Sequence, residues 1–297
     1  MAIGIDPTVD YAFKKLLGNP DHPAITLHFL NTILAPEVKL TDVEILNPIL
    51  GKEAENDKLS ILDVAARDET GRLYDIEMQT SLPTGLSQRL AYYTASMYVG
   101  QIGEGDDYTL LRPAISICVL DAILFRQSDQ IHSDFRLRSR DGQLRLSDGL
   151  QIHLLELPKY EVPSDNRLIT DPVEAWLYLF RRGREMSAEE IRQRFAFPVF
   201  QEIAKVIEMI QRTPDWRSQY ELRLKAQRDE QARLQQARAE GEAWGEARGE
   251  ARGKVIGQIE TLSELLGEPA TSLDGLRLEE LTTLASELQR RLRERDV

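Results

Sequence analysis

One stretch of the sequence, ILDVAARDETGRLYDIEMQ at 61–79, combines the pattern of a buried β-hairpin with the acidic residues Asp63, Asp75 and Glu77. Isoleucine, leucine, valine and alanine fill many of the other positions, and Gly71 lies between the two expected strands. A carboxylate in an apolar strand costs on the order of several kcal/mol unless another group pairs with it. Any fold of this chain must therefore supply a compensating charge for these acids.

The loop between the two strands decides whether the acids meet. Glu69-Thr70-Gly71 fits a three-residue hairpin loop with glycine in the left-handed position, and this loop places Asp63 directly opposite Glu77. Cross-strand neighbours share a face, with Cβ atoms about 4.5–5.5 Å apart. A two-residue turn at Thr70-Gly71 would shift the register by one residue and place the two acids on opposite faces.

Two like charges opposite each other destabilise a hairpin, and a divalent cation between them reverses the sign of that effect. Mg²⁺ prefers oxygen ligands and typically takes one or two carboxylates, with water and substrate phosphate in its remaining positions. We therefore predict a metal site at Asp63 and Glu77. The alternative is local neutralisation, of Asp63 by Lys58 and of Glu77 by Arg72 or Arg89.

Apolar periodicity along the rest of the chain predicts an α/β fold, with a mixed sheet in the first half and helices after it. The first helix is expected to begin with Asp6 as its N-cap and to end at Gly18. The expected strands lie at 39–48, 58–68, 72–80, 114–125 and 151–157, and the expected helices at 6–18, 22–34, 84–102, 171–183, 187–196, 197–213 and 273–292. We expect four segments, namely 1–165 (the α/β domain), 166–214 (a helical extension), 215–260 (a charged linker) and 261–297 (a small helical domain).

The charged linker contains glycines four residues apart, at Gly241, Gly245, Gly249, Gly253 and Gly257. Each costs about 1 kcal/mol against alanine in a helix, and the spacing keeps the five on one face. Two interpretations stay open: a close helix-to-helix contact that makes a homo-oligomer through the C-terminal helical region, or a marginally stable helical linker.

Composition narrows the function classes. The 297 residues carry a net charge of −12, which argues against a nucleic-acid coat protein but leaves room for an enzyme that grips nucleic acid through bound cations. The sequence contains no run of about 18 apolar residues that could span a membrane, and its N-terminus lacks a signal-peptide pattern. With the single Cys118 expected as a buried apolar residue, we predict a cytoplasmic protein without an intrachain disulfide.

Weaker signals lie elsewhere. The run FRLRSRDGQLRLSDG at 135–149 is basic, and it either tracks a phosphate backbone or forms a solvated hairpin. The four histidines show no paired metal-ligand spacing: His22, His28, His132 and His153.

An aspartate at the end of one strand, followed on the next by an acid, any residue and a polar residue, resembles the PD-(D/E)XK nuclease superfamily. Here these residues are Asp63 and Glu77-Met78-Gln79. The chain resembles more specifically the Rpn group of recombination-promoting nucleases, also labelled transposases. That resemblance is close over residues 6–125 and loose in the glycine repeat, and it rests on DYAFKKLLGNPDHPAITLHFLNTIL, KLSILDVAARDETGRLYDIEMQ and QRLAYYTASMY.

The resemblance implies a PD-(D/E)XK nuclease-like core that cleaves DNA phosphodiesters with Mg²⁺, or with Mn²⁺ as a substitute. It implies that Asp63, Glu77 and the main-chain carbonyl of Met78 hold the metal. Gln79 stands where the superfamily usually has lysine, and glutamine orients water but carries no positive charge. Lys58 is a candidate for the missing cation.

Four further residues are candidates by the same resemblance. Asp10, on the first helix, would approach the metal, or would form an ion pair with Lys14 four residues on. Gln88, Arg89 and Tyr92, on the helix after the hairpin, would contact phosphate or stack on a base. The alternative is a helix that packs Tyr92 and Tyr93 into the core, with Arg89 solvated or paired.

The sequence thus predicts a Mg²⁺-dependent DNA endonuclease that acts in recombination, mobile-element or defence processes. The alternative is a catalytically inactive, nuclease-like module for DNA binding or oligomerisation. Gln79 in place of lysine is the feature that favours this alternative.

Overall fold

The computed structural model describes residues 4–46, 63–267 and 272–295. The chain forms two compact units, Met1–Gln227 and Arg228–Val297. The first unit contains all six strands of the sheet and the predicted metal site, so the site is built within one unit.

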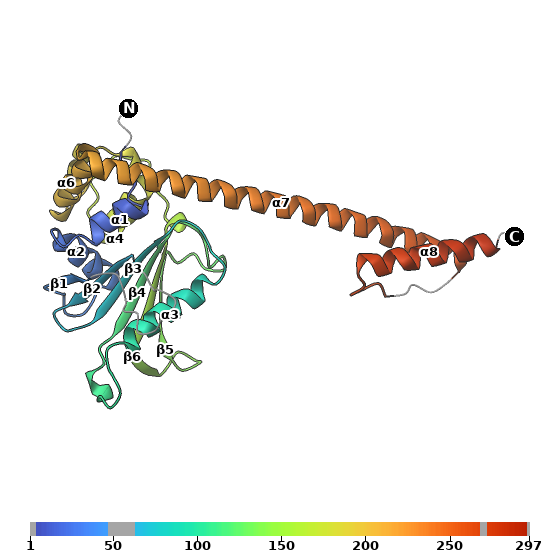
Figure 1. Ribbon diagram of the computed structural model, residues 1–297, viewed down its shortest axis with the longest axis horizontal. Helices are drawn as coiled ribbons and strands as arrows, with labels where there is room; N and C mark the ends of the chain where they lie inside the picture. Colours follow the sequence, from blue (N-terminus) through green and yellow to red (C-terminus); the bar gives the residue numbers. More distant parts are fainter. Residues whose placement is uncertain (1–3, 47–62, 268–271, 296–297) are drawn as a thin grey trace. The chain divides into compact units, whose positions relative to one another are not determined.

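The helices and strands of the first unit alternate as the apolar pattern predicts, apart from one additional strand (Figure 1). In chain order the elements are α1 (Asp10–Leu17), α2 (Pro23–Leu34), β1 (Val43–Leu46), β2 (Val64–Asp68), β3 (Leu73–Gln79), α3 (Leu86–Val99), η1 (Tyr108–Leu110), β4 (Ala114–Leu120), β5 (His132–Arg138), β6 (Arg145–Glu156), η2 (Leu157–Lys159), α4 (Pro172–Arg182), η3 (Gly183–Glu185), α5 (Ala188–Arg194), α6 (Val199–Arg212) and α7 (Pro214–Leu266), which contains the boundary between the units.

The six strands form one sheet in the order β1-β2-β3-β4-β6-β5. Strands β1, β2 and β3 pair antiparallel, β3 pairs parallel with β4 and β4 with β6, and β5 closes the edge antiparallel to β6. The expected α/β fold with a mixed sheet flanked by helices is therefore confirmed. The additional strand, β5, and the first half of β6 come from the basic run, which forms a hairpin at the sheet edge.

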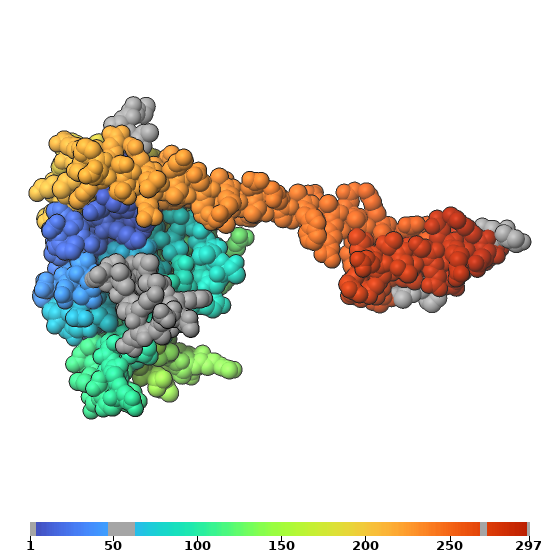
Figure 2. Space-filling view, in the orientation of Figure 1, coloured from blue at the N-terminus to red at the C-terminus, as the bar shows by residue number. Residues whose placement is uncertain are grey.

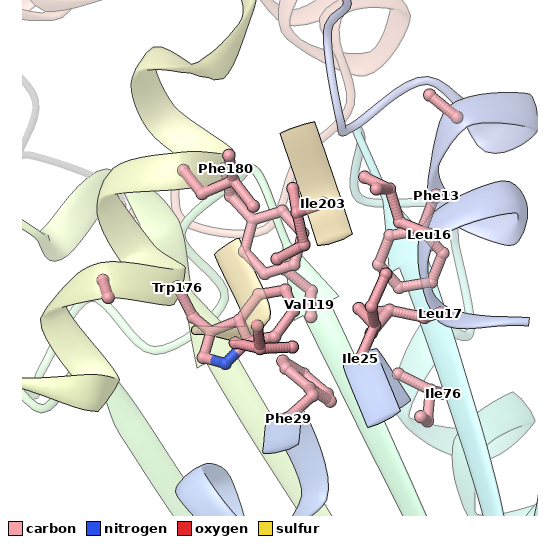
Figure 3. Packing of buried hydrophobic residues seen from close by; sticks show 14 of the residues in the cluster. Phe13, Leu16, Leu17, Ile25, Phe29, Ile76, Val119, Trp176, Phe180 and Ile203 are labelled. Atoms are coloured by element: carbon pink, nitrogen blue, oxygen red, sulfur yellow. The ribbon is translucent and has the colours of Figure 1, made fainter. Parts of the chain in front are cut away.

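Alternation along the central strands divides the sheet into two faces. Tyr74, Ile76 and Met78 of β3 belong to the large apolar core that also contains residues of α1, α2, α4, α5 and α6. Figure 3 shows side chains of α1, α2, α4 and α6 meeting Ile76 of β3 and Val119 of β4. The opposite face is covered by α3, through two smaller apolar clusters. Asp75 and Glu77 therefore lie on the face that α3 covers.

The β2–β3 turn is held by the buried carboxylate of Asp68. Its Oδ1 accepts hydrogen bonds from the Thr70 amide (2.8 Å), the Thr70 hydroxyl (2.7 Å) and the Arg72 amide (3.0 Å), and its Oδ2 accepts one from the Tyr74 hydroxyl (2.7 Å). Gly71 has φ +84°, the left-handed conformation that glycine adopts without strain. The predicted three-residue loop is thus confirmed.

The loop sets the register of the whole hairpin. Val64 pairs with Ile76 and Ala66 with Tyr74, so the position before β2, Asp63, falls opposite Glu77. The register predicted from the turn residues is confirmed, and the one-residue slip that a shorter turn would produce does not occur.

The first helix begins later than predicted. Val9, not Asp6, is the N-cap of α1, and the Asp6 carboxylate instead accepts hydrogen bonds from the amide and the hydroxyl of Thr8. The expected N-cap is therefore wrong, because this local turn takes the carboxylate. The predicted end is confirmed: Gly18 is the C-cap, and its amide donates to the carbonyl of Lys14.

The second unit pairs the C-terminal part of α7 with α8 (Leu278–Arg295) (Figure 1 and Figure 2). Its small core consists of Ile259, Leu262, Leu281, Ala285 and Leu288. The glycine repeat lies in α7, and a Cβ built on any of its five glycines meets no atom within 4 Å apart from its chain neighbours and the nearby backbone of its own helix. The repeat is therefore open in this chain, and both interpretations of it stay predictions. In the described part of the chain, no helix is both long and apolar enough for a bilayer.

We expect Asp68→Ala to lower the free energy of unfolding by about 3 kcal/mol, because it leaves several buried donors without an acceptor. The measurement is urea unfolding at neutral pH. Asp141→Ala is the matched control, since Asp141 accepts bonds from Ser139 and the Gln143 amide in the exposed β5–β6 turn. Its cost is expected to stay below about 1 kcal/mol. Equal costs for the two variants would contradict the structural role given to Asp68.

Candidate metal centre

Asp63 and Glu77 converge at one end of the β2–β3 hairpin. Glu77 is buried in β3, with 3% of its surface exposed, while Asp63 lies just before β2 with its side chain 21% exposed. The Oδ2 atom of Asp63 accepts a hydrogen bond from the amide of Met78 at 3.2 Å. This bond ties Asp63, which lies just before β2, to the strand that carries Glu77. The two carboxylates therefore approach each other although Asp63 is not itself a strand residue.

The backbone of Met78 points toward Asp63. In an extended strand the amide and the carbonyl of one residue project from the same edge. The amide donates to Asp63, so the Met78 carbonyl faces this same side, at the place where β2 has not yet begun. The next carbonyl, of Gln79, faces the other edge and accepts from the Asp121 amide at 2.8 Å. One main-chain oxygen is therefore directed to the carboxylate pair.

Two cations lie against the carboxylates. The ammonium of Lys14, on α1, lies 3.2 Å from Asp63 Oδ1 and 2.7 Å from Asp10 Oδ1. The guanidinium of Arg89, on α3, lies 3.6 Å from Glu77 Oε2. Asp10 thus makes the ion pair with Lys14 that its spacing predicts and also belongs to the surroundings of Asp63.

The predicted neutralising partners are only partly correct. Arg89 pairs with Glu77 as one alternative proposed, but Arg72 pairs instead with Asp68, at 3.4 Å. Lys58 was expected to neutralise Asp63 or to replace the missing lysine of the motif, and it lies outside the described residues. Lys14 was missed as a partner of Asp63, because its spacing signals only the bond to Asp10 on its own helix.

Burial and repulsion by neighbouring acids raise the pKa values of all three hairpin acids. For Glu77, burial and then the Asp63 charge raise the pKa to about 7, against a partial lowering by Arg89. For Asp63, burial raises the pKa and the Lys14 charge opposes it. For Asp75, burial and the Glu77 charge raise the pKa well above its ordinary value. Lys14 and Arg89, the cations described at the site, therefore do not fully compensate this negative charge.

Asp75 is fully buried behind Glu77 in a small polar network. Its Oδ2 accepts a hydrogen bond from the Ser116 hydroxyl at 3.1 Å, and Ser116 in turn lies 2.9 Å from the hydroxyl of Thr94 on α3. Its Oδ1 has no hydrogen-bond partner. The network joins β3, β4 and α3 directly beneath the carboxylate pair. The Ser116 hydroxyl therefore compensates part of the cost of burying Asp75. Strand alternation in the sequence predicted only the face of the sheet on which Asp75 lies.

The donor set fits a small, hard divalent cation. Asp63 and Glu77 supply carboxylate oxygens and Met78 a carbonyl oxygen, and incompletely neutralised carboxylates favour a bound cation. Within the described ranges, no group of three or more His, Cys, Asp or Glu residues is arranged to hold a metal. A cation here would therefore depend on the carboxylate pair, the carbonyl and outer ligands such as water or phosphate, a set typical of Mg²⁺ rather than of zinc.

The candidate DNA-contacting residues on α3 differ in exposure. Gln88 and Tyr92 are exposed, Tyr92 by 52%, while Arg89 is half-buried and turned toward Glu77. Tyr92 is therefore not packed into the core as the alternative supposed. Tyr93 is half-buried against a small apolar cluster, and Arg89 is paired, as that alternative also expected. Gln79, at the end of β3, donates a hydrogen bond from its Nε2 to Glu77 at 3.4 Å.

Two weaker sequence signals also have outcomes. In the basic hairpin, Arg136 pairs with Asp134 and Asp148, and Arg145 also pairs with Asp148. His132 and His153, far apart in sequence, lie on β5 and β6 with their ring nitrogens 2.9 Å apart. Sequence spacing missed this pair because strand pairing, not a local motif, brings the two rings together.

A mixed α/β sheet with an aspartate just before one strand, opposite the glutamate of a Glu-x-Gln strand, is consistent with a PD-(D/E)XK-type core. In agreement with this geometry, a family model described as PD-(D/E)XK nuclease family transposase matches residues 7–237. The chain belongs to this family, which supports a nuclease-type function. No curated protein and no solved structure matches the chain.

We expect Glu77→Gln to stabilise the metal-free protein at alkaline pH. The folded pKa of Glu77 is raised to about 7, so its ionisation opposes folding. Its contribution to stability is present at acidic pH and is lost as pH rises through this value. At about pH 8 the variant should gain roughly 1–3 kcal/mol over the wild type, and at about pH 5 the difference should shrink toward zero.

The measurement is urea unfolding in the presence of a chelator at both pH values. Glu246→Gln, at an exposed position of α7, is the control and should leave the stability unchanged. A destabilised Glu77→Gln variant at alkaline pH would mean that the Arg89 ion pair outweighs burial and repulsion.

Proposed function

We propose that this protein is a Mg²⁺-dependent DNA endonuclease that hydrolyses phosphodiester bonds, with Mn²⁺ as a substitute metal. The observation that carries the proposal is the convergence of Asp63 and Glu77, two carboxylates that remain incompletely neutralised by the cations beside them. Membership of a nuclease family supports the same conclusion. We favour hydrolysis over strand transfer, which needs a DNA 3′ end as the nucleophile.

Each residue of the centre has a proposed task. Asp63, Glu77 and the Met78 carbonyl would hold the cation, and Asp10 would add negative charge from α1. A bound divalent cation supplies charge stabilisation at the scissile phosphate and lowers the pKa of its water. Gln79 would orient a water molecule through its amide, which now donates to Glu77.

Helix α3 would face the DNA on one side of the centre. Gln88 and Tyr92 are exposed there, and an exposed tyrosine offers a stacking surface for a base, while Gln88 offers hydrogen bonds to phosphate. Arg89 would exchange its ion pair with Glu77 for a contact with the substrate backbone. The net charge of −12 implies that binding depends on such local groups and on metal ions rather than on a basic surface.

We expect the purified protein to nick or degrade plasmid DNA with Mg²⁺ or Mn²⁺ and to be inactive with a chelator. Asp63→Ala should lower the cleavage rate by at least about a hundredfold, since it removes a metal ligand. The measurement is the loss of supercoiled plasmid over time. Asp229→Ala, at an exposed position of α7, is the matched control and should cut like the wild type. Undiminished cutting by Asp63→Ala would place the activity elsewhere or in a contaminant.

Metal binding should also be visible without DNA. A ligand that binds only the folded state stabilises it, so Mg²⁺ at about a hundredfold excess over its Kd should raise Tm by roughly 5 °C or more. The shift should vanish in Asp63→Ala and should not appear with NaCl of equal ionic strength. DNA binding without cleavage and without a metal-induced shift would favour instead the inactive module that Gln79 suggests.

A further inference from the structure

Gln79 leaves the centre without the positive charge that a lysine at this position would provide. Phosphodiester cleavage builds negative charge on the phosphate oxygens, and a preorganised cation stabilises that charge. Among the described residues, the side chains that hold positive charge against the carboxylate pair are Lys14 and Arg89. Each is therefore a candidate to replace the missing lysine.

Lys14 is held in place by a rigid element. Phe13, Leu16 and Leu17, its neighbours on α1, are at most 1% exposed and belong to the large core. The helix ends one turn later, where the Gly18 amide donates to the Lys14 carbonyl. The backbone of Lys14 is thus fixed, while its side chain is 37% exposed and open to an incoming substrate.

The contacts of the Lys14 ammonium are suited to an exchange of partners. It bridges Asp63 at 3.2 Å and Asp10 at 2.7 Å. A divalent cation would bind Asp63 and so compete with Lys14 for it. The shorter contact of Lys14, to Asp10, is made within α1 and would not be lost. With Asp63 holding a divalent cation, the Lys14 ammonium would keep Asp10 as its anchor and would turn away from the added positive charge. It would then have an N–H donor free for a phosphate oxygen.

Arg89 is less suited to this task. It approaches Glu77 only at 3.6 Å, and its Nε is buried without a hydrogen-bond partner, although its side chain is 35% exposed. Lys14 is preferred because it makes the closer contact and has a second anchoring carboxylate, Asp10.

We propose that Lys14 is the catalytic cation that Gln79 does not supply. It pairs with Asp63 in the metal-free protein and moves to a non-bridging oxygen of the scissile phosphate in the loaded enzyme. The inference rests on the proposed nuclease function and assigns the position of the charge within it.

The test uses the full-length chain with Lys14→Met and two readouts. The first is Mn²⁺ affinity without DNA, from the rise of Tm with Mn²⁺ concentration. Because the variant removes a competing cation, it should bind Mn²⁺ about three- to tenfold more tightly than the wild type. The second is the single-turnover cleavage rate at saturating Mn²⁺, which should fall by about a hundredfold or more. Tighter metal binding with slower cleavage is a combination that a purely structural role does not produce.

Lys15→Met is the matched control, because Lys15 lies on the same turn of α1 but 4.0 Å from the centre of the Trp216 ring rather than at the carboxylates. It should change both readouts by less than about threefold. Lys14→Arg should recover at least about a tenth of the wild-type rate, since it keeps the charge. Lys14→Gln is a second neutral variant that keeps a donor for Asp10, and it should behave like Lys14→Met.

Each result decides the matter. Cleavage at the wild-type rate by folded Lys14→Met or Lys14→Gln would overturn the inference, and so would a parallel loss of Mn²⁺ affinity and cleavage. If the wild type neither binds Mn²⁺ nor cuts DNA, the proposed function itself fails, and the inference fails with it.

Discussion

The turn held by Asp68 is the constraint on which the rest of this structure depends. Its buried carboxylate binds the backbone of the loop and the hydroxyl of Tyr74, so the three-residue turn admits one pairing of β2 with β3. A slip of one residue would move every side chain of a strand to the other face. The register therefore decides that Asp63 and Glu77 meet. Asp68, whose role is structural, thus positions the two acids for which we propose a chemical role.

The hairpin places its charges where folding alone would not favour them. Glu77 and Asp75 are buried on the face covered by α3, their pKa values are raised, and Lys14 and Arg89 compensate only part of the charge. Functional sites commonly retain such local instability because the surrounding structure supports it. Here the support comes from the large core on the opposite face, in which α1, α2 and the later helices α4 to α6 share one apolar cluster. A bound cation would turn an unfavourable arrangement into a stabilising one.

The features of the hairpin that the sequence predicted are those set by residues close together in the chain. Turn chemistry at Gly71 and strand alternation predicted the register and the faces, because both depend on residues close together in the chain. Periodicity also predicted the mixed α/β sheet. The contact of Lys14 with Asp63, the pairing of His132 with His153 and the binding of Arg72 to Asp68 rather than Glu77 depend on how distant or competing groups pack. The later start of α1 follows from competition between two uses of Asp6, which its residue type alone does not rank.

The central claim is that the two converging carboxylates share one divalent cation. Crystals of the protein soaked with Mn²⁺ test it directly, because anomalous scattering locates the metal without reference to activity. We predict a single strong peak within coordination distance, about 2.0–2.3 Å, of oxygens from Asp63, Glu77 and the Met78 main chain. Saturating Mn²⁺ with no peak there, while Lys14 and Arg89 still occupy the two carboxylates, would contradict it.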